Sequence, residues 1–105
     1  MNADRLEALR SMLISDANNT FARYGLAMEL INVGDLEAAV SEFATLRERN
    51  PDYAAAYFHG GKTLETLGRL DDARALMEEG IRVTTRTGDS HTRSELQAAL
   101  DLLGI

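Results

Sequence analysis

The sequence has no cysteine, no tryptophan and a single proline. Without cysteine the chain can build neither a disulfide framework nor a thiolate metal site. The scarcity of proline and of long polar tracts argues against a disordered chain. The N-terminal residues alternate between charged and apolar side chains and contain no long apolar run, which excludes a signal peptide or a membrane-spanning segment there. We therefore expect a folded cytoplasmic protein.

Positive charge is also scarce. Eleven Lys and Arg residues stand against seventeen Asp and Glu, for a formal net charge of −6. Nucleic acids and anionic membranes are bound through clustered Lys and Arg, so we expect neither as a partner. The remaining composition, 45% hydrophobic and 27% charged in 105 residues, is that of one ordinary globular domain.

Apolar residues recur at helical spacing throughout the chain, and the breaks between periodic segments carry turn residues. Gly34 and Gly68 can each close a helix in the left-handed conformation. Side chains suited to capping the start of a helix precede several segments, among them Asn2, Asp35 and Asp52. The pattern predicts an all-α chain whose fifth helix ends weakly in a run of β-branched residues before Gly88. The expected helices cover about 2–14, 20–33, 36–49, 52–67, 70 to beyond 81, and 89–103.

The sequence also resembles itself at a spacing of 34 residues, a period typical of helical repeat proteins. Small, large and turn residues recur at matching places in the two copies. The matching pairs are Tyr24 with Phe58, Leu30 with Leu64, Gly34 with Gly68, Leu36 with Leu70, Ala39 with Ala73, and Phe43 with Met77.

These two copies resemble the tetratricopeptide repeat, whose pattern is Trp-x-x-Leu-Gly-x-x-Tyr, then Ala-x-x-x-Phe, then Pro. The first copy has Arg23-x-x-Leu26-Ala27-x-x-Leu30, then Ala39-x-x-x-Phe43, then Pro51; the second has Tyr57-x-x-Gly60-Gly61-x-x-Leu64, then Ala73-x-x-x-Met77, then Thr85. The resemblance implies a right-handed helix-turn-helix solenoid of about six helices in one domain, 1–105. Its parts are an N-terminal half-repeat helix (1–17), repeat 1 (18–51), repeat 2 (52–87) and a C-terminal capping helix (88–105).

The resemblance further implies a concave groove, lined by the first helix of each repeat, that holds a peptide or a partner helix. Phe21 is a candidate for the groove and, alternatively, for the core. The Lys/Asn/Arg clamp with which some family members grip the C-terminal carboxylate of chaperones is not supported, because Tyr24 and Met28 stand at its first positions. The groove candidates are Phe21, Tyr24, Met28, Ile31, Ala55, Phe58, Lys62 and Glu65, together with Arg93, which fits one position of the clamp.

Signals for chemistry are weak. Gly60-Gly61-Lys62-Thr63 resembles the end of a phosphate loop, but Ala56 replaces its first glycine and the stretch lies within a helical pattern. His59 and His91 have no second metal ligand at a suitable spacing. His59 either contacts a partner or is an exposed bystander. No nucleophile, base and acid can be assembled, so we expect no enzyme, no cofactor and no metal.

Two functions remain. The first is a non-catalytic adaptor or scaffold that binds a protein or peptide segment in its groove. The alternative is a structural module that assembles with copies of itself through its terminal helices, 2–14 and 90–103, because short repeat arrays have open ends.

Overall fold

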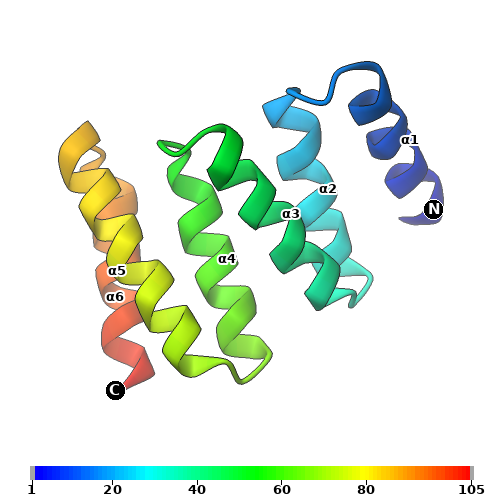
Figure 1. Cartoon of the computed structure of the whole chain (residues 1–105). Helices are drawn as coiled ribbons and strands as arrows, with labels where there is room; N and C mark the ends of the chain where they lie inside the picture. Colours follow the sequence, from blue (N-terminus) through cyan, green and yellow to red (C-terminus); the bar gives the residue numbers. More distant parts are fainter. Residues whose placement is uncertain (1, 105) are drawn as a thin grey trace.

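A computed structural model describes residues 2–104, with side chains from residue 4 onward, and shows an all-α chain as predicted (Figure 1). Within that range there is no strand, and none of the helices is long and apolar enough to cross a membrane. The helices are α1 (Asn2–Ser15), α2 (Thr20–Asn32), α3 (Leu36–Arg49), α4 (Ala54–Thr66), α5 (Leu70–Thr87) and α6 (Ser90–Leu103).

The helices form a row in which each packs against its neighbours in the chain, and the two termini lie at opposite ends (Figure 1). Only α4 and α6 make a substantial contact between non-consecutive helices within the described part of the chain. The row measures 38 × 28 × 19 Å. Its interior contains two apolar clusters, one over α1–α4 and one over α4–α6. Such a stack, in which helices contact near neighbours only, is a repeat solenoid.

The two predicted glycine turns have the same geometry. Gly34 and Gly68 follow the ends of α2 and α4 with φ of +85° and +81°, the left-handed region that glycine adopts without strain. The amide of the next residue closes each turn, from Asp35 to the Leu30 carbonyl and from Arg69 to the Leu64 carbonyl, both at 2.9 Å. These turns make α2–α3 and α4–α5 two copies of one unit.

The start of α4 differs from the prediction. The helix begins at Ala54 with Tyr53 at its N-cap, so Asp52 does not cap it. Pro51 and Asp52 instead form a turn, which a hydrogen bond from the Tyr53 amide to the Asn50 carbonyl closes at 3.1 Å. The Asp52 carboxylate forms a 2.9 Å ion pair with Arg86 of α5. The predicted capping role of Asn2 lies outside the described side chains.

The end of α5 lies where the sequence predicts it. The helix continues without a break to Thr87 and ends at Gly88, the predicted stop, which has φ of +79°. Threonine hydroxyls bond back to carbonyls one turn earlier, from Thr84 to Gly80 at 2.8 Å and from Thr85 to Ile81 at 2.7 Å. Thr84 is also buried on α5, so tertiary packing outweighs its low helix propensity.

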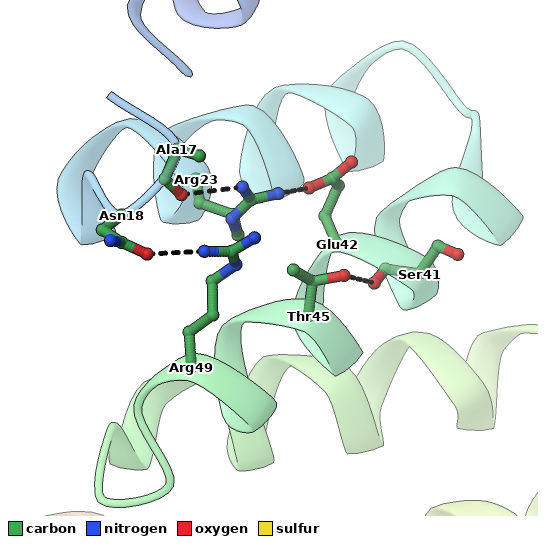
Figure 2. Close-up of polar contacts among 7 residues, drawn as sticks. All are labelled: Ala17, Asn18, Arg23, Ser41, Glu42, Thr45 and Arg49. Carbon is green, nitrogen blue, oxygen red and sulfur yellow. Dashed lines mark hydrogen bonds and ion pairs between the residues drawn. The ribbon is translucent and has the colours of Figure 1, made fainter. Parts of the chain in front are cut away.

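The two repeats stabilise their helix pairs through different side-chain contacts. Where the family pattern has an aromatic residue, repeat 1 has Arg23, whose guanidinium donates to Glu42 of α3 at 2.7 Å and to the Ala17 carbonyl at 3.0 Å (Figure 2). Repeat 2 keeps an aromatic residue there. The Tyr57 hydroxyl donates to the Pro51 carbonyl at 2.7 Å, and its ring packs in the core.

Candidate functional site

An aromatic cluster joins α2 to α4. The Tyr24 ring of α2 meets Tyr53 edge-on with ring centres 5.7 Å apart, and lies 5.9 Å from the imidazole of His59. Phe58 meets the same imidazole edge-on at 5.1 Å. Behind it, the buried ring of Phe43 stacks on His59 at 6.4 Å. His59 is therefore the centre of the cluster.

Burial determines the ionisation of this cluster. It lowers the pKa of His59 below its usual value, and the negative charge of Glu95 offsets only part of that effect. It also raises the pKa values of the Tyr24 and Tyr53 hydroxyls. All three groups are therefore neutral near pH 7, and the cluster consists of uncharged ring faces and edges. The alternative that His59 is an exposed bystander is wrong.

Two hollows flank Lys62 of α4. The first, of about 210 Å³, lies between α2 and α4, and the second, of about 250 Å³, lies between α4 and α6. Both have mainly apolar walls. We call the combined surface the inner face. The first hollow is lined by Met28, Ile31, Leu36, His59, Lys62, Thr63 and Thr66, and the second by Phe58, Lys62, Glu95, Ala98, Ala99 and Leu102.

Charge on the inner face is sparse and mixed. Lys62 pairs with Glu65 one turn along α4, with Nζ and Oε1 3.2 Å apart. Glu95 of α6 lies 3.5 Å from His91, whose side chain is 86% exposed. No charged side chain of α2 lines either hollow. The surface is therefore apolar at its α2 end and carries both signs of charge toward α6.

The structure brings together most of the predicted groove residues. Met28, Ile31, Phe58 and Lys62 line the hollows, and Tyr24 belongs to the aromatic cluster beside them. Phe21 is 75% exposed, so the alternative that it is a core residue is wrong. Ala55 is half-buried on α4, and Glu65 contributes through its pair with Lys62.

Arg93 is not brought together with the others. It lines neither hollow. The α6 residues that do line one are Glu95, Ala98, Ala99 and Leu102, and a residue two positions before Glu95 points to a nearly opposite side of a helix. The match of Arg93 to one position of the clamp therefore did not predict which face of α6 lines the second hollow.

Sequence reasoning did not identify Tyr53, Glu95, Ala98 or Leu102. The last three recur at three- to four-residue spacing along α6, which is the signal for a shared helix face. Leu102 is 79% exposed, an unusual position for a leucine whose helix also contributes buried Leu96 and Ala99 to the core. The apolar stripe of α6 is thus wider than its core requires.

The glycine pair that resembles a phosphate loop has a packing role. Gly60 and Gly61 are buried within α4, and a Cβ atom on Gly61 would lie 2.9 Å from Cγ of Met77 in α5. The two glycines let α4 approach α5 closely.

A further hollow, of about 350 Å³, lies between α3 and α5 away from the inner face. Its walls carry both signs of charge, from Arg47, Arg69, Asp72 and Glu79. The Arg47 guanidinium lies 5.8 Å from the ring centre of Tyr57, and burial lowers its pKa. The stacked arginine covers core aromatic surface.

Comparisons with known proteins agree with this architecture. The sequence profile of the tetratricopeptide repeat matches residues 24–85. A TPR repeat-containing protein of Pseudomonas aeruginosa is 30% identical over 95 residues, which cover 90% of each chain. The solution structure of a tetratricopeptide repeat domain protein from Salinibacter ruber is 38% identical over 84% of this chain and 89% of its own, with a TM-score of 0.79.

A more distant likeness extends the fold comparison. The TPR2B domain of yeast Sti1, solved as a complex with pHsp70, superimposes with a TM-score of 0.87 over 94% of this chain and 79% of its own, at 11% identity. At that identity the likeness shows the fold alone. The profile match and the two closer relatives show more: the chain belongs to the tetratricopeptide repeat family.

Proposed function

We propose that this protein is a non-catalytic interaction module, a cytoplasmic adaptor that holds a peptide or a partner helix on its inner face. One observation carries the proposal: two adjoining apolar hollows lie between α2, α4 and α6, beside an accessible aromatic cluster. The complex of the yeast Sti1 domain with pHsp70 supports it, because the same fold holds a protein ligand there.

The hollows favour binding because their apolar surface is not filled by the chain's own side chains. Hollows of about 210 and 250 Å³ each have room for one or two large side chains of a ligand. Burying such a side chain contributes about 1.5–3 kcal/mol. Aromatic residues such as Tyr24 and Phe58 add contact area at a low entropy cost, which is why they dominate interaction hot spots.

The groups on the inner face suit binding better than catalysis. His59 is neutral and packed between rings, and Lys62 is paired with Glu65. Neither stands beside a nucleophile with a second base to orient it, the arrangement that covalent or acid–base catalysis requires.

The test compares captured partners between variants. The wild-type protein, Phe58→Ala, and Leu70→Ala are immobilised and exposed to an extract of the source cells. Leu70 is the matched control, because it is a 40% exposed leucine at the start of α5, outside both hollows. Circular dichroism establishes that each variant is folded. The proposal expects a protein retained by wild type and Leu70→Ala and lost by Phe58→Ala; equal retention by all three refutes it.

Self-assembly is the second candidate, favoured by the exposed apolar residues of α1. The helix α1 lies at one end of the row, and on it Ile14 is 87% exposed and Met12 is 40% exposed. Both would be covered if a second copy packed on that end. Light scattering of wild type and Ile14→Lys separates the two candidates. A dimer that Ile14→Lys dissociates supports assembly, whereas a monomer in both cases leaves the inner face as the interaction surface.

A further inference from the structure

We propose that the segment held on the inner face is basic and amphipathic: its apolar residues fill the two hollows and a Lys or Arg pairs with Glu95. This inference rests on the proposed function, since it names the kind of partner that the same surface selects.

Glu95 is a carboxylate of the inner face that forms no ion pair with a lysine or arginine in the described part of the chain. It lines the second hollow together with Phe58 and Leu102. Within the described part of the chain, its one ion-pair partner is His91 at 3.5 Å, an exposed imidazole that carries charge only when protonated. A ligand guanidinium or ammonium placed over this hollow would therefore meet an available carboxylate.

Lys62, by contrast, already has its counter-charge. Among the described residues it is the one lysine or arginine that lines either hollow, and its ammonium lies 3.2 Å from the Glu65 carboxylate. An acidic ligand would have to compete with Glu65 for that ammonium while lying close to Glu95. A basic ligand has only the exposed imidazole of His91 to displace from Glu95, and the Glu65 carboxylate offsets the repulsion from Lys62. The local arrangement therefore favours positive charge in the ligand.

The charge of the whole protein acts in the same direction. A formal net charge of −6 attracts cationic segments over a long range and repels acidic ones. The hollows add a requirement for apolar side chains on the same segment. Charge and shape together describe a segment with an apolar stripe bordered by Lys or Arg.

The test uses designed helical peptides and measures binding by fluorescence anisotropy near physiological ionic strength. One peptide carries a leucine stripe bordered by lysine, a second carries the same stripe bordered by glutamate, and a third keeps the lysine composition with the stripe scrambled. The protein is used as wild type, Glu95→Gln, Glu48→Gln and Phe58→Ala. Glu48 is the matched control, because it is an exposed carboxylate on α3 that lines neither hollow.

We expect the lysine-bordered peptide to bind wild type more tightly than either of the others. Glu95→Gln should weaken that binding about two- to fivefold, the effect of a partly exposed ion pair, and Glu48→Gln should leave it unchanged. Phe58→Ala should weaken it about tenfold or more.

Three results overturn the inference: the glutamate-bordered peptide binds as well as the lysine-bordered one, the two Gln variants weaken binding equally, or neither striped peptide binds. If an acidic peptide binds and Phe58→Ala weakens it, the charge inference fails while the inner face stands. If the basic peptide binds and Phe58→Ala has no effect, the inner face itself is the wrong surface, and the proposed function fails with it.

Discussion

Gly80 of α5 offers a sharp test of the packing that joins repeat 2 to the last helix. The residue is buried where three helices meet, and a Cβ atom there would lie 2.7 Å from Cβ of Tyr57 in α4 and 2.9 Å from Cδ1 of Leu96 in α6. The tyrosine Cβ cannot rotate away, because it is attached directly to the helix backbone. Gly80→Ala therefore forces α4 and α5 apart.

The expected magnitude follows from two opposing effects. Replacing glycine by alanine inside a helix stabilises it by about 1 kcal/mol. Overpacking a tight core costs about 1–3 kcal/mol, and a 2.7 Å contact with a rigid atom belongs in the upper part of that range. We expect Gly80→Ala to lower the free energy of unfolding by about 1–2 kcal/mol, which corresponds to a fall of roughly 5–10 °C in Tm.

Gly25 is the matched control. It lies inside α2, and its added Cβ would meet only the Leu9 side chain, at 3.1 Å, which can adjust. Gly25→Ala should keep most of the helix-propensity gain and be stabilised by up to about 1 kcal/mol. Urea denaturation followed by circular dichroism measures both variants. If Gly80→Ala is as stable as wild type, or gains as much as Gly25→Ala, the close approach of α4, α5 and α6 is wrong.

Three further predictions concern single side chains. Arg23→Met should lower the free energy of unfolding by about 1–3 kcal/mol in urea denaturation, because it removes the partly buried bond to Glu42 and the exposed bond to the Ala17 carbonyl. Arg49→Met loses one exposed bond and should cost far less; equal losses would contradict this reasoning. Leu96→Ala should cost about 2–5 kcal/mol by thermal denaturation, since this side chain is fully buried; a loss below about 1 kcal/mol would show that α6 is not part of the core. Burial lowers the pKa of His59, so the unfolded state takes up its proton more readily. The resulting stability is present above the usual histidine pKa and is lost as pH falls toward 5. In the same denaturation assay, the free energy of unfolding of His59→Phe should fall less between pH 7 and pH 5 than that of wild type. An equal fall in both proteins would contradict the burial of His59.

Local signals predicted most of the fold. The glycines at 34, 68 and 88 end helices because each adopts the left-handed conformation that other residues avoid. The error at Asp52 is one of position: Pro51 and Asp52 form a turn, so Tyr53 becomes the N-cap of α4, and the Asp52 carboxylate pairs with Arg86. At the end of α5, helix propensity alone did not include the burial of Thr84.

The candidate site was less accessible to sequence reasoning. The positions on α2 and α4 follow from two matching copies, and residues such as Met28 and Phe58 line the hollows. To predict which residues of α6 line the second hollow, the rotation of α6 about its own axis must be known. The sequence contains no third copy of the repeat pattern that would specify this rotation. That rotation presents Glu95 and Leu102 to the second hollow and leaves Arg93 outside it.

Chemical-shift mapping of a captured partner segment on the isotope-labelled protein tests the central claim most directly. We predict that the largest shifts cluster on the inner face, at Tyr24, His59, Lys62 and Leu102, while the charged surface of α5 stays unchanged. Shifts centred on α1 around Ile14, with the inner face unaffected, would contradict the account and place the interaction at the end of the row.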